Sequence, residues 1–199
     1  MTPEVEEETA LSRAALYGLF SRLYREAPTA EILDALKAAD MELDIPSGGQ
    51  GMEELAVEFT RLFLGPGPHI SPYESVHAAA TGQPALLWGP QTSAVRRFIE
   101  AMGLSIGDET FIPDHVSVEF ELMQRLVERE ARARREEDVA MAEECLKAER
   151  KFLSEHLGAW FPKFAGKVAG AARLPFYRQV TDLAADFLEK EEGDERGGI

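Results

Sequence analysis

The sequence of 199 residues contains one cysteine, Cys145, which excludes an internal disulfide and favours a reducing compartment. It contains no apolar run long enough to cross a bilayer, so stable membrane insertion is not expected. The first residues, MTPEVEEETA, lack the basic and apolar segments of an export signal. Together these absences predict a cytoplasmic protein.

The sequence also lacks the short motifs of common enzyme classes. It has no G-x-G-x-x-G, no P-loop, no G-x-S-x-G and no C-x-x-C. Cys145 shares a predicted helix face with Met141, Ala148 and Phe152, so we expect it to pack as a small apolar side chain rather than act as a catalytic thiol. No motif therefore points to a catalytic residue.

Basic residues are outnumbered: 21 Lys and Arg stand against 36 Asp and Glu, giving a formal net charge of −15 at pH 7. Such a field repels nucleic acid and anionic lipid and attracts basic partners. Acidity also aids solubility. The charge therefore disfavours a nucleic-acid partner and is compatible with a cationic one.

Apolar residues recur at helical spacing along most of the chain, and no alternating strand-like run occurs. The predicted fold is an all-α, single-domain bundle of about seven helices. The helices are expected near 2–26, 29–40, 52–64, 91–102, 113–129, 138–157 and from 175 onward. The domain covers 1–192, with a front half (1–64), a crossover (65–90), a back half (91–192) and a frayed tail (193–199).

The crossover interrupts the helical pattern with five prolines and four glycines. Structureless stretches of this length are uncommon in compact domains. Its apolar residues disfavour disorder, so an ordered loop with a short helical turn near 75–80 is expected. Tyr73 is either part of a recognition surface or a plug between helices. Trp88 fits a core anchor better than a contact residue.

The segment from Ile112 to Arg129 organises the predicted bundle. Asp114, after Pro113, is expected to cap its helix, and His115 and Glu119 lie one turn apart beside an apolar stripe. These two side chains could share a metal, with further ligands from His69, His77 or His156, or they could be a helix-mouth side chain and a partner of the helix dipole. The stripe that faces the core consists of Val116, Phe120, Met123 and Val127.

Taken together, these stretches resemble the TorD/DmsD/NarJ family of redox-enzyme maturation chaperones. The order of the segments carries the resemblance, which covers about residues 16–188. The segments are F-x-x-L-F-L-G-P-G-P at 59–68, S-P-Y-E-S-V-H at 71–77, I-P-D-H-V-S-V-E-F-E-L-M at 112–123, F-L-x-E-H-L-x-x-W at 152–160 and F-Y at 176–177.

The resemblance implies an all-helical chaperone without enzymatic activity, and neither a cofactor nor a metal is expected. Its partners would be the catalytic subunit of a molybdopterin oxidoreductase and that subunit's twin-arginine signal peptide. The chaperone would hold them in the cytoplasm, as a monomer or homodimer, until cofactor insertion and export or assembly. DmsD-like members tend to have Pro where Ile112 stands and often have Trp where Tyr73 stands, so a NarJ-like branch remains open. Two alternative functions stay open: a metal-dependent helical enzyme that uses His115 and Glu119, and a helical adaptor that does not read signal peptides.

The residues that this family associates with peptide binding fall on two segments of the present chain. Carboxylates here could accept paired bonds from arginine, and an adjoining apolar groove would take the rest of the peptide. The sequence thus predicts an open, acid-rimmed notch where the crossover meets the helix that follows Pro113. Its members are Pro72, Tyr73, Glu74, Ser75, Pro113, Asp114, His115 and Glu119, with Trp88 and His77 in support.

Overall fold

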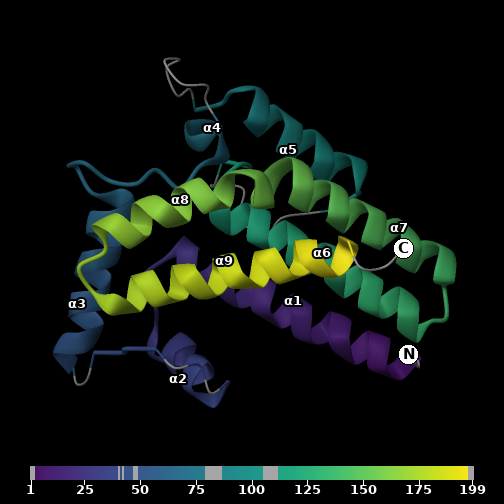
Figure 1. The fold of residues 1–199 in the computed structure, drawn as a ribbon, viewed down its shortest axis with the longest axis horizontal. Helices are drawn as coiled ribbons and strands as arrows, with labels where there is room; N and C mark the ends of the chain where they lie inside the picture. The colour runs from purple at the N-terminus through teal and green to yellow at the C-terminus, as the bar shows by residue number, and fades with distance from the viewer. Residues whose placement is uncertain are drawn as a thin grey trace.

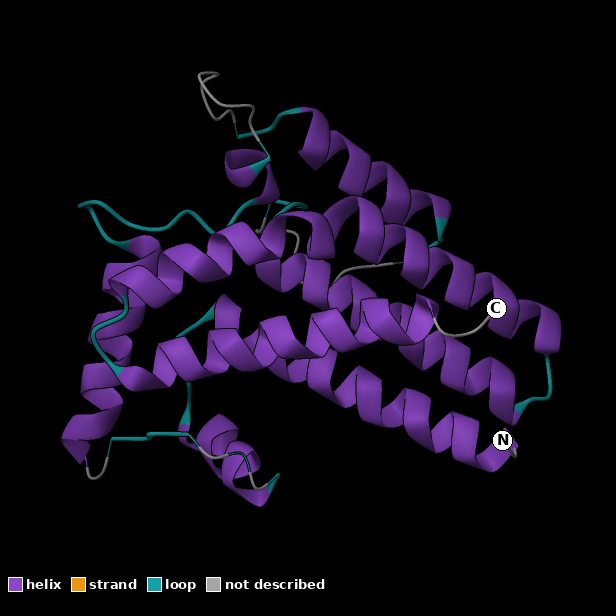
Figure 2. Cartoon of the chain, viewed as in Figure 1, coloured by secondary structure: helices purple, strands orange, loops and turns teal. Residues whose placement is uncertain are grey.

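The computed structural model describes residues 3–39, 41, 43–46, 49–78, 87–104 and 112–196. Within these ranges the chain is helical and forms no strand, which confirms the all-α prediction (Figures 1 and 2). The elements are α1 (Pro3–Arg25), α2 (Ala30–Ala38), α3 (Gly49–Phe59), η1 (Thr60–Leu64, a π-helix), α4 (Glu74–His77), α5 (Pro90–Ala101), α6 (Val116–Arg135), α7 (Val139–Phe152), η2 (Leu153–Leu157, a π-helix), α8 (Gly158–Ala171) and α9 (Pro175–Arg196).

Helix α6 is the centre of the bundle. Helices α1 and α7 pack along it, and α8 and α9 form an adjacent pair (Figure 1). Every residue from Asp114 to Met123 is buried, although the sequence pattern predicted a single apolar stripe. A helix that is covered on all sides must also bury its polar side chains, so each of these needs a partner inside the protein.

An aromatic cluster fixes α6 against its neighbours. The ring of Phe120 lies 5.5 Å from that of Phe20 and stacks on Tyr24 at 5.9 Å, both from α1. On its other side Phe161 of α8 meets it edge to face at 5.6 Å. Such pairs contribute about 0.5–1.5 kcal/mol each beyond the burial of apolar area. The start of α6 is therefore held rigidly.

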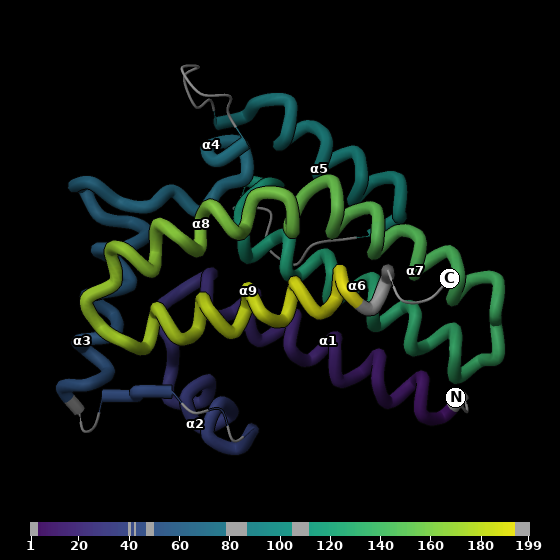
Figure 3. The backbone as a smooth tube through the Cα atoms, viewed as in Figure 1, coloured from purple at the N-terminus to yellow at the C-terminus, as the bar shows by residue number. Residues whose placement is uncertain are grey.

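The chain runs from α7 through η2 into α8 without a break, as the tube in Figure 3 shows, so the expected helix end at Gly158 is wrong. Pro162 lies inside α8. The π-helical turn ahead of it widens the helix, which accommodates the proline. A Cβ at Gly158 would lie 2.8 Å from the Leu153 carbonyl oxygen, so only glycine fits this turn.

Other expectations have mixed outcomes. Cys145 is fully buried, as predicted, whereas Trp88 is 62% exposed and is not a core anchor. Helix α9 continues to Arg196, through the start of the expected tail, because nothing after Gly193 prevents another helical turn. The expected order of residues 79–86 in the crossover and the state of residues 197–199 lie outside the described ranges.

None of the helices in the described ranges combines the length and the apolar character that a membrane span requires.

Candidate functional site

The crossover is joined to the start of α6 by a short antiparallel bridge between Tyr73 and His115. Glu74 N donates to the Asp114 carbonyl oxygen at 2.9 Å, and Val116 N donates to that of Pro72 at 2.8 Å. The rings of Tyr73 and His115 meet edge to face with centroids 5.0 Å apart. The structure therefore brings the two predicted segments into direct contact.

Asp114 does not cap α6, contrary to the sequence prediction. Its Oδ2 accepts from Ser75 N at 3.0 Å, at the start of α4, and its Oδ1 accepts from Thr92 Oγ1 at 2.8 Å, on α5. The N-cap of α6 is His115, whose Nδ1 accepts from Ser117 N at 3.1 Å. Asp114 is completely buried and ties α4 and α5 to the base of α6.

Glu119 and Glu74 form a buried pair of carboxyl groups. Glu119 Oε2 accepts from Trp160 Nε1 at 2.8 Å, and Glu74 Oε2 lies 2.9 Å from His156 Nδ1. Burial and the charge of Glu74 raise the pKa of Glu119 well above its usual value. A proton on Glu119 lets Oε1, which otherwise has no partner, donate to Glu74. Burial and Glu74 therefore favour the protonated, neutral form of Glu119.

Two neighbouring histidines, His115 and His77, favour the neutral state. Burial, with a smaller contribution from Arg25, lowers the pKa of His115 to about 3. Burial also lowers the pKa of His77, whose Nε2 donates to the Ser71 carbonyl oxygen at 2.7 Å. The His77 ring stacks on Trp160 at 5.2 Å. We call these interlocked side chains the α4–α6 cluster: Glu74, His77, Asp114, His115, Glu119, His156 and Trp160.

The predicted site residues therefore come together, but the expected open notch is wrong. Tyr73 and Pro113 are half-buried, and Trp88 is exposed on the surface. The carboxylates face donors of the chain itself because α4, α5 and α8 close over the start of α6. The remaining predicted members are all buried: Pro72, Glu74, Ser75, His77, Asp114, His115 and Glu119.

Trp160, His156 and Thr92 were not predicted to be partners of buried carboxyl groups, and His156 was considered only as a further metal ligand. A signal for the first two was present, since H-L-x-x-W at 156–160 places both side chains one turn apart on one helix face. The sequence carried no such signal for Thr92, because a single threonine in a helical segment does not indicate a buried hydrogen bond. Their shared function here is to satisfy buried carboxyl groups.

The geometry does not support a metal site at His115 and Glu119. His115 Nδ1 points to Ser117, whose Oγ lies at 2.7 Å, while Glu119 is engaged with Trp160 and Glu74. Across the part of the chain that the structure describes, no group of three or more His, Cys, Asp or Glu side chains is arranged to hold a metal ion.

A second feature, which we call the α3 groove, is open to solvent. Two adjoining cavities of about 420 and 490 Å³ lie between α3, η1 and the turn that joins α8 to α9. Both cavities are lined by Val57, which is 63% exposed, and by Arg173. Further lining residues include Glu53, Glu54, Glu58, Arg61 and the loop 65–68.

The groove is acidic at one end and apolar in the middle. Arg61 donates twice to Glu58, at 2.7 Å each, and these bonds outweigh burial to lower the pKa of Glu58. This pair is therefore neutral overall. Glu53 and Glu54 are exposed, and among the described residues neither has a cation within ion-pair distance. Arg173 is the groove's other cation.

Comparison with known proteins adds sequence relatives to this geometry. The family model described as nitrate reductase delta subunit matches residues 24–166. The chaperone protein TorD of Vibrio cholerae is 28% identical over 140 residues, 69% of this chain and 60% of that protein. A perchlorate reductase assembly chaperone protein of Dechloromonas aromatica is 28% identical over 141 residues, 66% of this chain and 59% of that protein. The chain thus spans about three fifths of these relatives.

A solved structure shares the fold. It is the crystal structure of a protein assigned as a redox enzyme maturation protein from Archaeoglobus fulgidus, with a TM-score of 0.58 and 23% identity. The likeness covers 89% of this chain and 93% of that one. The names of the sequence relatives describe chaperones rather than catalysts.

Proposed function

The chain belongs to the nitrate reductase delta subunit family, and from this membership we propose that it is a chaperone dedicated to a molybdopterin oxidoreductase subunit. It binds the apo form of that subunit in the cytoplasm, aids insertion of the cofactor and delays export or assembly. It catalyses no reaction of its own. The observation that carries the proposal is the family match over residues 24–166, which includes every member of the α4–α6 cluster.

The finer part of the proposal is that the chaperone binds a twin-arginine signal peptide. Such a peptide presents an arginine pair followed by an apolar segment. The buried carboxylates of the α4–α6 cluster already have partners, so in this conformation they hold the half-buried Tyr73 and Pro113 in place rather than receive arginine. Tyr73 and Pro113 remain the cluster's candidate contacts with the peptide.

The α3 groove has the exposed carboxylates and the exposed apolar surface that the α4–α6 cluster lacks. Glu53 and Glu54 offer two solvent-exposed carboxylates, and Val57 offers apolar surface beside them. Each cavity is within the usual size range of ligand sites, about 300–1,000 Å³. The net charge of −15 would draw a cationic peptide toward the protein and raise the association rate at low salt. We therefore assign the arginine pair to the Glu53–Glu54 end.

A titration tests this proposal. The probe is a fluorescently labelled peptide with an Arg pair followed by a Leu/Ala segment, and its control has Lys in place of Arg. We expect tighter binding of the Arg peptide, since guanidinium pairs with carboxylates in a planar, bidentate geometry. Glu53→Gln/Glu54→Gln should weaken binding about fivefold, and Arg173→Gln should strengthen it about twofold.

The matched control is Glu143→Gln/Glu144→Gln, which removes the same charge from an exposed face of α7 and should leave affinity unchanged. Weaker binding in Tyr73→Ala but not in the groove variant would place the peptide on the α4–α6 cluster instead. Equal affinity for the Arg and Lys peptides would reject signal-peptide recognition. The chain would then act as an adaptor that contacts the folded subunit.

A further inference from the structure

An exposed aromatic and basic surface lies before and along α5 and shares no residue with the α4–α6 cluster or the α3 groove. We call it the Trp88 patch, and it consists of Leu87, Trp88, Arg96 and Arg97. Leu87 and Trp88 are 47% and 62% exposed, and both arginines are exposed. We propose that this patch docks an acidic, amphipathic segment of a protein partner, in which carboxylates alternate with apolar side chains.

The backbone at Trp88 supports an external role. Trp88 has φ of 64°, in the left-handed region that side chains with a Cβ rarely adopt. Such a conformation has a steric cost, and the indole, which is mostly in water, buries little surface to offset that cost. A residue that combines a strained backbone with a mostly exposed side chain is a candidate for binding. Tryptophan is also enriched among residues that dominate interface energetics.

The two arginines define the charge of the partner. Arg96 Cζ lies 5.8 Å from the centroid of the Trp88 ring, close enough for a cation–π contact that orients both side chains. Other arginines of the described chain (Arg13, Arg25, Arg61 and Arg134) bond to carboxylates. In the same described ranges, neither Arg96 nor Arg97 has a carboxylate within ion-pair distance.

This combination is unusual on a chain with a net charge of −15. The surrounding field disfavours any approaching anion, so an acidic segment would bind only where local cations and apolar surface outweigh that repulsion. The Trp88 patch offers both. A nucleic acid would meet the same repulsion over a much longer charged chain, which favours a short acidic peptide segment.

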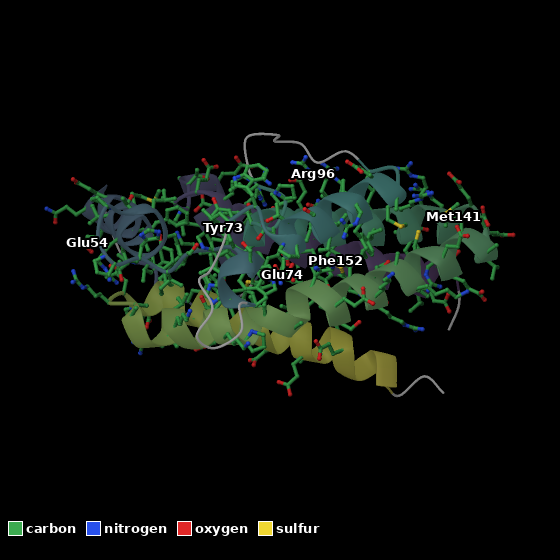
Figure 4. The ribbon with its side chains drawn as sticks, turned by 90° about the horizontal axis from the view of Figure 1, so that it is seen from above. Glu54, Tyr73, Glu74, Arg96, Met141 and Phe152 are labelled. Carbon is green, nitrogen blue, oxygen red and sulfur yellow. The ribbon has the colours of Figure 1, made fainter. Side chains whose placement is uncertain are left out.

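The Trp88 patch is separate from the α3 groove. In Figure 4, Glu54 lies at one end of the molecule, whereas Arg96 lies along one side, with Tyr73 between them in the view. The two surfaces also have opposite chemistry, since one presents carboxylates and the other guanidinium groups. The inference therefore does not depend on where, or whether, a cationic peptide binds.

The probe for the test is a fluorescein-labelled peptide in which Glu alternates with Leu and Phe, followed by fluorescence anisotropy at physiological ionic strength. We expect the full chain to bind it, and Arg96→Gln/Arg97→Gln to weaken binding about fivefold. Trp88→Ala should weaken it about tenfold. The matched control, Arg22→Gln/Lys190→Gln, removes two exposed cations from α1 and α9 and should retain full affinity.

Peptide controls complete the experiment. Replacing Glu with Gln in the peptide should weaken binding to the same degree as removing the two arginines, about fivefold. The proposal is overturned if the chain does not bind the acidic peptide, if the Trp88 patch variants bind it as well as the control variant does, or if a short oligonucleotide binds the patch more tightly. None of these results bears on the twin-arginine peptide, so the two proposals fail independently.

Discussion

The indole Nε1 of Trp160 donates a 2.8 Å hydrogen bond to Oε2 of Glu119, joining α8 to the buried start of α6. Trp160 is 2% exposed and Glu119 is fully buried. Burial and the charge of Glu74 favour the protonated form of this carboxyl group, whose Oε2 accepts from Trp160 and whose Oε1 can donate toward Glu74 when it carries the proton. A buried polar contact therefore joins α8 to α6 in addition to the aromatic contact of Phe161 with Phe120.

Glu119→Gln should be close to neutral for folding. A glutamine amide can accept from Trp160 and donate toward Glu74, as the protonated carboxyl does, so we expect the free energy of unfolding at pH 7 to change by less than about 1 kcal/mol. Glu119→Ala leaves the indole N–H unpaired and opens a cavity, and should cost about 3 kcal/mol. Urea denaturation measures both. Equal losses in the two variants would contradict a protonated Glu119.

Asp114→Ala should destabilise the protein by about 3 kcal/mol. It removes the acceptor for Ser75 N and for Thr92 Oγ1, leaving two buried donors unpaired. Because Asp114 ties down α4, amide hydrogen exchange at Ser75 should also accelerate. The control is Asp34→Ala, whose side chain is 78% exposed in the parent and whose loss should cost less than about 0.5 kcal/mol. A loss as small as that of the control would contradict the assigned role of Asp114.

His115 should make stability depend on pH. Its pKa is about 3 in the folded chain and about 6.5 when unfolded, so between these values only the unfolded chain binds the proton. Stability therefore falls as pH decreases from 6.5 toward 3. His115→Asn keeps an N-cap acceptor for Ser117 N but does not titrate.

Relative to His115→Asn, the parent should lose about 2 kcal/mol of stability between pH 7 and pH 5. Comparing the two proteins removes the contribution of all other titrating groups. Denaturation curves at both pH values test this, and parallel pH profiles for the two proteins would rule out a depressed pKa for His115.

Glu137→Gly should stabilise the turn between α6 and α7. Glu137 has φ of 57°, just after the last turn of α6, where glycine avoids the steric cost of a Cβ. We expect a gain of about 1 kcal/mol and a higher melting temperature. Glu136→Gly, at a φ of −84°, should instead lower it. The same sign of change in both variants would be inconsistent with strain at Glu137.

Helical periodicity predicted most of the fold because each helix has an apolar stripe of its own. Periodicity failed to predict the helix boundaries that depend on tertiary contacts. Pro162 and Gly158 are poor helix residues, yet η2 widens the helix ahead of them and lets α8 continue. Helix propensity describes an isolated segment, whereas packing against α6 stabilises a continuous helix.

The candidate site shows a different limit of sequence reasoning. The family resemblance predicted that the segments around Tyr73 and His115 would lie together. It did not predict that most of their side chains would be buried. Charged residues near a helix start are usually solvent-exposed. Nothing local in the sequence reveals that α4, α5 and α8 cover this helix start and supply Ser75 N, Thr92 and Trp160 as partners.

The buried thiol of Cys145 makes the chain convenient for labelling. Burial raises its pKa to about 11, so almost no thiolate is present near neutral pH and maleimide reagents should leave it unmodified. A cysteine introduced on the surface would then be the single reactive position, without first removing a native one. Spin labels or dyes placed at Val57 or Leu87 could follow each docking surface separately on an otherwise unaltered chain.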